Sequence, residues 1–172
     1  GLILDLRNNG GGSLRDAVDI SGFFISKGPV VQVSNSYKRK ETYRDIDNKL
    51  YFDKPLIVLV NTFSASASEI VAAALQDYKR AIIIGDNHTF GKGTVQKVFD
   101  LNRNFKKNVN NLGYLKITIQ EYFRINGQST QFNGVMPDII IPNKYDYLKV
   151  GEKELKFAFK GTITTPSYFV DW

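Results

Sequence analysis

The sequence predicts an α/β fold with a mixed β-sheet and flanking helices. Short aliphatic runs recur along the chain between Gly, Pro and Asn residues, which is the pattern of buried strands. Two segments with helical periodicity follow such runs through short turns, as in β-loop-α units. Hairpin-type turns at 126–127 and 133–134 separate the later runs, which indicates antiparallel pairing among the later strands.

The amino-terminal half of the chain alternates strands and helices. A strand at 2–6 leads through a glycine-rich turn into a helix over 14–24, and a Gly-Pro pair ends this unit. A second strand is expected at 30–33. The polar, charged excursion from 34 to 48 is expected to be an exposed hairpin or loop.

The strongest strand signal is at 55–60, a continuous aliphatic run of the kind that is buried on both faces of a parallel sheet. An alanine-rich helix over 68–78 follows it. The glycine-containing segment 85–93 is expected to be a loop. The remaining expected strands lie at 81–84, 94–101, 114–124 and 135–141.

Composition narrows the chemistry that is open to the chain. Its 172 residues are 42% hydrophobic and 23% charged, so a single domain over 1–172 is expected. The absence of Cys excludes disulfides and thiol chemistry, and a single His leaves little from which to build a metal site. The net charge of +6 is scattered, which indicates a solvated surface or attraction to an acidic partner. We therefore expect no metal, no cofactor and no nucleic-acid partner.

The chain has no apolar run near the ~20 residues that span a bilayer. It opens directly on a strand pattern. We therefore expect it to be an excised part of a longer protein whose targeting segment lies upstream.

Three serines alternate with alanines in SASASEI at 64–70, after the strongest strand and before an expected helix. Ser66 and Glu69 match the capping-box pattern, and that role alone explains many such segments. A serine at this position also lies beside free backbone amides and the positive end of the helix dipole, where an oxyanion would be stabilised. Both interpretations of Ser66, a helix cap and a nucleophile, are open at this point.

The glycine turn at 10–12 leaves a similar choice. Without side chains, its backbone amides could approach an oxyanion from a second strand-to-helix turn. A simple turn explains the same residues equally well.

A nucleophilic serine requires a base, and the sequence offers few candidates. His88 lies in a polar loop, where a surface position is the simpler interpretation. Asp77 lies about 16 Å along the helix from Ser66, so the two cannot touch within one helix. Lys92 lies between two glycines in FGKGTVQ, and in an extended strand it would share one face with Thr94 and Gln96, so that a polar residue could hold the amine in place.

The lysine segment does not match a phosphate-binding loop, whose pattern is G-x-x-x-x-G-K-[ST]. Five residues separate Gly85 from Gly91, and Gly93 rather than Ser or Thr follows the lysine. A nucleotide site is therefore not expected.

Three segments together identify a family. They are GLILDLRNNGGG at 1–12, the segment 58–96 with its SASASE and FGKGTVQ motifs, and NGVMPDIIIP at 133–142. In this order they resemble the carboxyl-terminal processing peptidases, or tail-specific proteases, which are serine proteases of family S41 with a crotonase/ClpP-like core. The segment 118–139 is most similar to the bacterial periplasmic tail-specific branch.

The resemblance implies a role for each matching residue. Ser66, the middle serine of SASAS, would be the nucleophile, and Lys92 would be its general base. Gln96 would hold the lysine amine, while the amides of Gly11 and Ala67 would form the oxyanion hole. The supporting residues would be Gly12, Glu69, Asp77 and Thr89.

Such a dyad needs a cleft that excludes water. A lysine amine has a reference pKa of about 10.4 and is a cation at neutral pH, so it must be desolvated before it can accept a serine proton. Phe63 and Phe90 are expected to exclude water from this cleft.

The resemblance implies a serine endopeptidase that cleaves proteins in a carboxyl-terminus-directed manner through an acyl-enzyme. Its substrates would be proteins or peptides with free, apolar carboxyl termini, and its location the periplasmic side of the bacterial cell envelope. The PDZ domain that usually delivers peptides in this family has no counterpart in 1–172, and no adaptor is identified. Two alternatives stay open: an inactive peptide-binding or scaffold module of the same fold, and an acyl-CoA enzyme of similar fold, which has no reason to keep Ser66 with Lys92.

Overall fold

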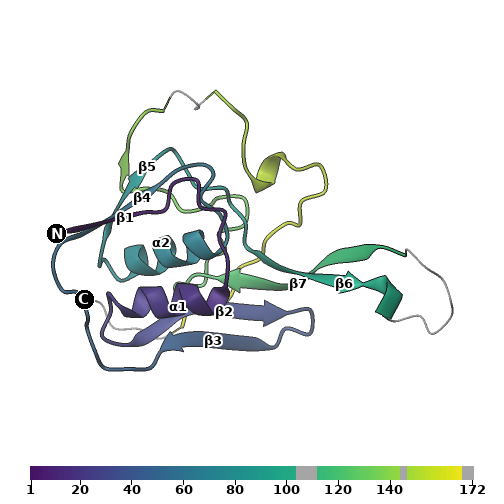
Figure 1. Ribbon diagram of the computed structural model, residues 1–172, viewed down its shortest axis with the longest axis horizontal. Helices are drawn as coiled ribbons and strands as arrows, with labels where there is room; N and C mark the ends of the chain where they lie inside the picture. The colour runs from purple at the N-terminus through teal and green to yellow at the C-terminus, as the bar shows by residue number, and fades with distance from the viewer. Residues whose placement is uncertain (104–111, 144–146, 168–172) are drawn as a thin grey trace.

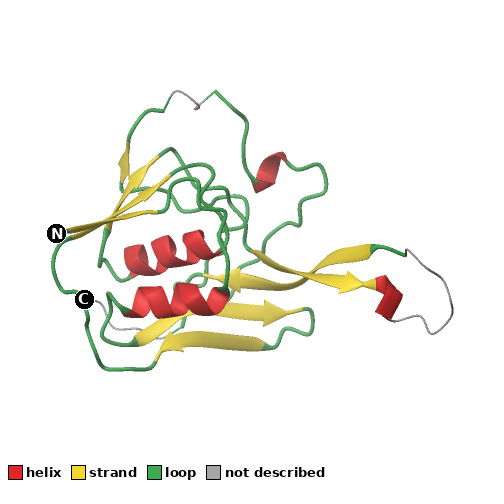
Figure 2. Ribbon diagram, viewed as in Figure 1, coloured by secondary structure: helices red, strands yellow, loops and turns green. Residues whose placement is uncertain are grey.

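The computed structural model describes residues 1–103, 112–143 and 147–167, and its two α-helices lie between two four-stranded sheets (Figures 1 and 2). One sheet is parallel with the strand order β1-β4-β5-β8, and the other is antiparallel with the order β3-β2-β7-β6. The predicted α/β class with a mixed pattern of pairing is confirmed.

Strands β1, β4 and β5 and the two α-helices follow the sequence prediction closely. The strands are β1 (Leu2–Asp5), β4 (Leu56–Val60), β5 (Ile82–Gly85) and β8 (Ile139–Ile140), and the helices are α1 (Leu14–Gly22) and α2 (Ala67–Asp77). Two single-turn 3-10 helices cover Leu101–Arg103 and Glu152–Glu154. None of the helices in the described ranges is long and apolar enough to cross a bilayer.

The antiparallel layer contains β2 (Gly28–Asn35), β3 (Lys40–Asp45), β6 (Thr94–Asp100) and β7 (Tyr114–Phe123). The charged excursion predicted at 34–48 is the β2–β3 hairpin. Strand β7 pairs with β2 at its carboxyl end and with β6 over most of its length. The outer part of β6 and β7 therefore projects from the body as a two-stranded ribbon (Figure 1).

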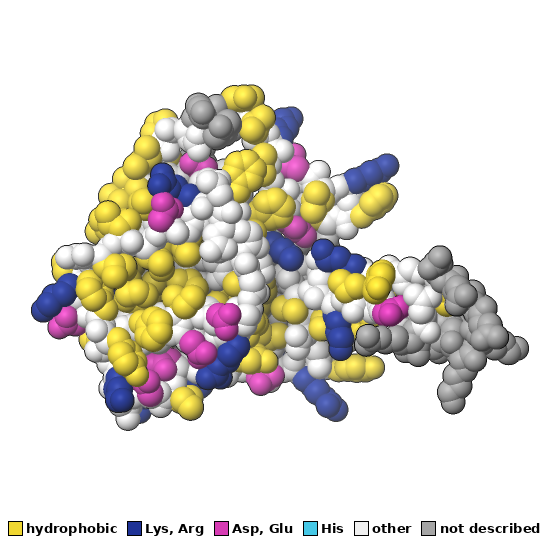
Figure 3. Space-filling view, in the orientation of Figure 1, with side chains coloured by type: hydrophobic (Ala, Val, Ile, Leu, Met, Phe, Trp, Pro, Cys, Tyr) yellow, Lys and Arg dark blue, Asp and Glu magenta, His cyan; other side chains and the backbone are white. Residues whose placement is uncertain are grey.

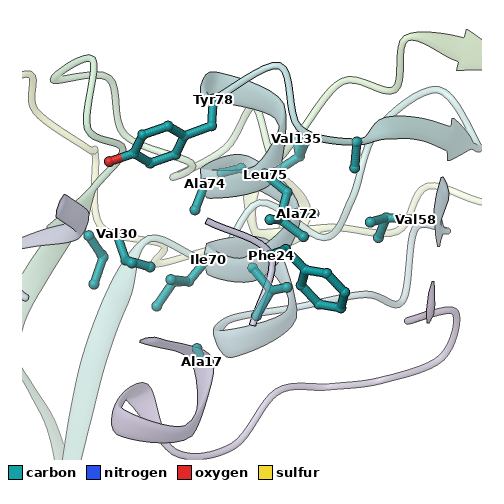
Figure 4. Packing of buried hydrophobic residues seen from close by; sticks show 14 of the residues in the cluster. Ala17, Phe24, Val30, Val58, Ile70, Ala72, Ala74, Leu75, Tyr78 and Val135 are labelled. Carbon is teal, nitrogen blue, oxygen red and sulfur yellow. The ribbon is translucent and has the colours of Figure 1, made fainter. Parts of the chain in front are cut away.

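Helix α2 forms the centre of the core because it is apolar on almost every side, as a helix covered on all faces must be. Figure 4 shows Ala72 and Leu75 of α2 among side chains from several other elements. Val58 comes from the parallel sheet, Val30 from the antiparallel sheet and Ala17 from α1. One continuous core thus fixes the start of α2 relative to both sheets.

Strand β4 departs from one expectation. Its inner face is buried against the helices, but Ile57 and Leu59 on the other face are only half-buried. No described helix covers that face, and the aliphatic side chains of Ile3 and Ile82 on the neighbouring strands are exposed there. Hydrophobic side chains gather on the surface over this part of the molecule (Figure 3). The prediction of burial on both faces was wrong.

The segment 135–141 also differs from its prediction. Only Ile139–Ile140 form a strand, and it pairs parallel with β5 rather than antiparallel. Pro137 has no amide to donate to a ladder. Next to it, the Asp138 carboxylate takes the place of a strand carbonyl by accepting from the Ile83 amide at 2.8 Å. Regular pairing therefore begins only after Asp138.

Candidate active site

The three serines of the segment 64–68 have different surroundings. Ser64 is fully buried, and its hydroxyl donates to the Leu6 carbonyl at 2.8 Å and accepts from the Asn61 amide at 2.9 Å. The Ser68 hydroxyl donates to the Asn9 carbonyl at 3.0 Å. Ser68 lines a separate pocket beside α1, and Ser66 alone of the three lines the cleft that also contains Lys92. The hydroxyls of Ser64 and Ser68 are thus engaged with backbone groups, and Ser66 is the one of the three that shares a cleft with Lys92.

Ser66 has an unusual backbone conformation at the junction of turn and helix. Its φ is 57° and its ψ is −115°, a region that side-chain-bearing residues rarely adopt. Ser66 and Glu69 are arranged as a capping box, but only the carboxylate half is a full hydrogen bond, in which the Ser66 amide donates to Glu69 Oε2 at 2.8 Å. The Ser66 hydroxyl makes no side-chain cap bond. Ser66 thus starts the helix while its hydroxyl stays available.

Glu69 links the turn at Ser66 to the loop that carries Lys92. This wholly buried carboxylate accepts four hydrogen bonds: at Oε1 from the Thr89 hydroxyl at 2.5 Å and the Gly91 amide at 2.7 Å, and at Oε2 from the amides of Ser66 at 2.8 Å and Lys92 at 3.0 Å. Burial raises the pKa of Glu69 to about 7, although the hydrogen bond from Thr89 and those from the three amides act in the opposite direction. One oxygen therefore holds the backbones of Ser66 and Lys92 side by side.

Tyr122 makes a second link between the same two residues. Its buried hydroxyl donates to the Lys92 carbonyl and lies 3.3 Å from the Ser66 carbonyl. Burial raises the pKa of Tyr122 well above its usual value, and the charge of Glu69 acts in the same direction. Sequence reasoning missed Tyr122 because nothing in an alternating strand distinguishes it from an ordinary core aromatic residue.

The cleft beside Ser66 has a volume of about 240 Å³ and contains both predicted members of the dyad. Its lining residues are Gly12, Leu14, Ser66, Ala67, Ile70, Lys92, Thr94, Val95, Gln96, Lys116 and Tyr122. Among these described residues, the structure records no hydrogen bond between the Ser66 hydroxyl and the Lys92 amine. Catalytic hydrogen bonds are often long before substrate binds, so the shared cleft is the informative observation.

The apolar wall of the cleft differs from the prediction. Phe63 and Phe90 do not line it, and Phe63 is 38% exposed. The backbone of Phe90 is instead fixed by bonds of its amide to Ser64 and of its carbonyl to Glu152. Leu14, Ile70 and Val95 are among the apolar lining residues. A register shift between Val95 and Gln96 interrupts the strand alternation there, which accounts for consecutive residues facing one cleft.

The glycine turn packs directly on the turn at Ser66. Gly11 has a φ of 97°, and a Cβ on it would lie 2.7 Å from Ser66 Cβ and 2.8 Å from the Ala67 nitrogen. The Gly11 amide donates to Asn9 Oδ1 at 3.0 Å, whereas Gly12 lines the cleft. Ala67 is the first residue of α2, so its amide has no acceptor within the helix. The two turns therefore bring backbone amides to the side of Ser66.

Two other predicted positions lie elsewhere. His88 does not line the cleft; its Nδ1 lies 2.7 Å from the Thr89 carbonyl and its Nε2 3.4 Å from Lys153 Nζ. Asp77, at the far end of α2, pairs with Arg124 at 2.5 Å and accepts from Asn126 at 3.1 Å. Asp77 supports the fold and not the cleft. Among the described side chains, no group of three His, Asp or Glu residues could hold a metal ion.

Comparisons with known proteins agree with this geometry. The family model described as Peptidase family S41 matches residues 1–141. A tail-specific protease of Haemophilus influenzae is 52% identical over 151 residues, which cover 88% of this chain and 22% of the relative. A carboxy-terminal-processing protease of Bartonella bacilliformis is 42% identical over 170 residues, which cover 94% of this chain and 37% of the relative.

Solved structures give the same result. The photosystem II D1 C-terminal processing protease matches with a TM-score of 0.70 and 36% identity, over 82% of this chain and 34% of that one. The chain spans well under half the length of each of these proteins.

Proposed function

Because the chain belongs to peptidase family S41, we propose that it is the catalytic core of a serine endopeptidase that acts in a carboxyl-terminus-directed manner, with Ser66 as nucleophile and Lys92 as general base. One observation carries the proposal: Glu69 Oε2 accepts hydrogen bonds from the amides of both residues, at 2.8 and 3.0 Å. This bridge keeps nucleophile and base at one cleft although 26 positions separate them in the sequence.

The proposed reaction follows from the groups in the cleft. Lys92, acting as general base, takes the proton of the Ser66 hydroxyl while Oγ bonds to the scissile carbonyl carbon. The resulting tetrahedral intermediate collapses when the protonated lysine gives that proton to the leaving amine, which leaves an acyl-enzyme on Ser66. Water, deprotonated by Lys92, then adds to the ester carbonyl, and Ser66 leaves with a proton. Gln96, which lies near the start of β6 and lines the cleft, would orient the Lys92 amine.

Backbone amides would stabilise the oxyanion. The Ala67 amide has no helical acceptor, and the glycine turn lies against it. Gly12 already lines the cleft, whereas Gly11 would first have to release Asn9 Oδ1. We therefore assign the second hydrogen-bond donor to the oxyanion to the glycine turn, without choosing between the amides of Gly11 and Gly12.

The names of the relatives suggest the substrate class. Tail-specific and carboxy-terminal processing activities lead us to propose substrates with free, apolar carboxyl termini, and the periplasmic side of the bacterial cell envelope as the place of action. Two unfolded reporter proteins that differ only in apolar or charged terminal residues would test the first point. Equal cleavage of the two would contradict it.

The choice of base is tested by two substitutions in the full natural polypeptide. Lys92→Arg should abolish cleavage, because arginine keeps its charge at any accessible pH and cannot accept the serine proton. His88→Ala should retain most activity, since His88 lies outside the cleft. Gln96→Ala should reduce the rate without abolishing it. An active Lys92→Arg enzyme, or a folded but inactive His88→Ala enzyme, would contradict the dyad.

A further inference from the structure

The cleft contains a second lysine that the proposed reaction does not use. Lys116 of β7 lines it together with Ser66 and Lys92. In the ribbon, Lys116 is opposite Val98 and Thr118 is opposite Gln96. Because side chains alternate along strands, these four residues share one face. The face that carries Gln96 at the cleft therefore continues outward to Lys116.

The charge of Lys116 is unopposed. None of the residues that line the cleft is acidic, and within the described parts of the chain the Lys116 amine has no ion pair or hydrogen bond. The ribbon carboxylates are engaged elsewhere. Glu121 accepts from the amide and hydroxyl of Thr162 at 3.2 and 3.1 Å, and Asp100 accepts from Asn102 at 3.0 and 2.9 Å. Lys116 is thus an exposed cation in a cleft that supplies no anion.

The position of Lys116 fixes how far from the dyad it would act. Thr94, the first residue of β6, is two positions from Lys92, and Val98 is four residues further along the strand. The four strand residues span about 14 Å, and the two residues before them add up to about 7 Å. An extended peptide that lies along the ribbon covers this length with about four to six residues.

We propose that Lys116 binds a carboxylate of the substrate about four to six residues from the scissile bond. The proposal rests on the proposed peptidase function and adds a preference to it. Two sources supply this chemistry: an Asp or Glu side chain, and the free α-carboxylate of a substrate that ends there. Lys116 then determines specificity, while Ser66 and Lys92 carry out the reaction.

Peptide cleavage by the full natural protein tests the proposal. A series of peptides places Glu, or Gln as its neutral match, at each of six positions on either side of the scissile bond, with free or amidated carboxyl termini. We expect kcat/KM to favour the carboxylate about 2- to 5-fold at one position between the fourth and the sixth, the range for a pair open to solvent. In Lys116→Gln this ratio should fall to about one, and in Lys116→Glu a lysine peptide should be preferred instead.

Lys97→Gln is the matched control. It removes one positive charge from the same ribbon, but Lys97 lies on the other face with its amine 5.2 Å from the Phe99 ring centre, so the ratio should be unchanged. A higher kcat/KM for the free than for the amidated form of the same peptide identifies the α-carboxylate as the source of the preference. A preference for Glu over Gln that survives amidation identifies the side chain.

A preference that is absent in the wild type, or kept in Lys116→Gln, would overturn the proposal while leaving the peptidase function intact. The affinity of the same peptides for Ser66→Ala, with and without Lys116→Gln, is measured by fluorescence anisotropy. The ratio of the dissociation constants of the Gln and Glu peptides then reports the same preference independently of turnover. A lack of cleavage would therefore count against the proposed function alone.

Discussion

The chain makes the same strand-turn-helix connection twice, and the serine at the start of the helix has different hydrogen bonds in the two cases. Both helices start at a serine with an acidic residue three positions later, Ser13 with Asp16 and Ser66 with Glu69. Ser13 has an ordinary extended conformation, with φ −71° and ψ 131°, and its hydroxyl accepts from the Asp16 amide at 3.2 Å. Its hydroxyl is thus occupied as a helix cap.

At the second connection the acidic residue takes over the capping. Glu69 is buried and binds the Ser66 amide, while the Ser66 backbone adopts a positive φ. The hydroxyl is then free to face the cleft. The comparison shows that one local motif gives a structural cap or a candidate nucleophile according to whether the carboxylate is solvated or buried.

The largest expected difference between the two connections is in catalysis. Ser66→Ala should lower kcat/KM by about four orders of magnitude or more, as removal of a serine nucleophile does elsewhere. Ser13→Ala should leave the rate nearly unchanged in the same peptide-cleavage assay. Ser68→Ala serves as a second control, since its hydroxyl only bonds to Asn9. Substantial activity in Ser66→Ala would remove the distinction between the two serines.

The two connections touch where Gly11 packs against Ser66 and Ala67, and disturbing this contact should have the next largest effect on the rate. Gly11→Ala places a methyl group against Ser66 and Ala67, at a φ that side chains disfavour, and should lower the rate about 10²- to 10³-fold by displacing oxyanion donors. Gly10→Ala is the matched control, because a Cβ there meets nothing within 4 Å. Thermal melting of both variants separates loss of fold from loss of rate. A folded Gly11→Ala enzyme with the wild-type rate would exclude this turn from the site.

The buried carboxylate predicts a pH dependence of stability. Because the pKa of Glu69 is raised from 4.5 to about 7, its protonated form is favoured in the fold. Its contribution to stability is complete below about pH 4.5 and is lost as the pH rises through 7, a change of up to about 3 kcal/mol in the free energy of unfolding. Urea unfolding between pH 4.5 and 8 measures this change.

Glu69→Gln should remove this slope. It should also destabilise the fold by about 1–3 kcal/mol, since a Gln amide group would face backbone donors. Asp16→Asn, the equivalent change at the exposed first connection, should alter the free energy of unfolding by no more than about 0.5 kcal/mol. An unchanged slope in Glu69→Gln would show that the titrating group lies elsewhere.

The smallest effect belongs to the first cap. Ser13→Ala removes the acceptor of the Asp16 amide and should lower the free energy of unfolding by about 1 kcal/mol, as for other N-caps. Chemical denaturation measures this loss, and a value near zero would mean that water replaces the cap without cost.

Much of the fold was accessible from the sequence because its signals are local. The aliphatic runs at 55–60 and 81–84 and the alanine-rich helix were predicted to within one or two residues. The segment 135–141 failed because Asp138 replaces strand pairing through a side chain, which no periodicity shows.

The candidate site was predictable only in part, for the same reason. The motifs around Ser66 and Lys92 are local and stand out in the sequence. The capping box showed Glu69 as a partner of Ser66, but not that its carboxylate also holds Lys92, because that contact depends on how distant segments pack. Tyr122 and Lys116 lie in an alternating strand, whose pattern gives no sign of what the strand faces.

The most direct test of the central claim is covalent labelling of the native protein with a serine-directed fluorophosphonate, followed by peptide mapping by mass spectrometry. We expect one adduct on Ser66, none on Ser13, Ser64 or Ser68, and loss of labelling in Lys92→Arg although that variant folds normally. An adduct on another serine, no adduct at all, or undiminished labelling of Ser66 in Lys92→Arg would contradict the assignment of Ser66 as a nucleophile activated by Lys92.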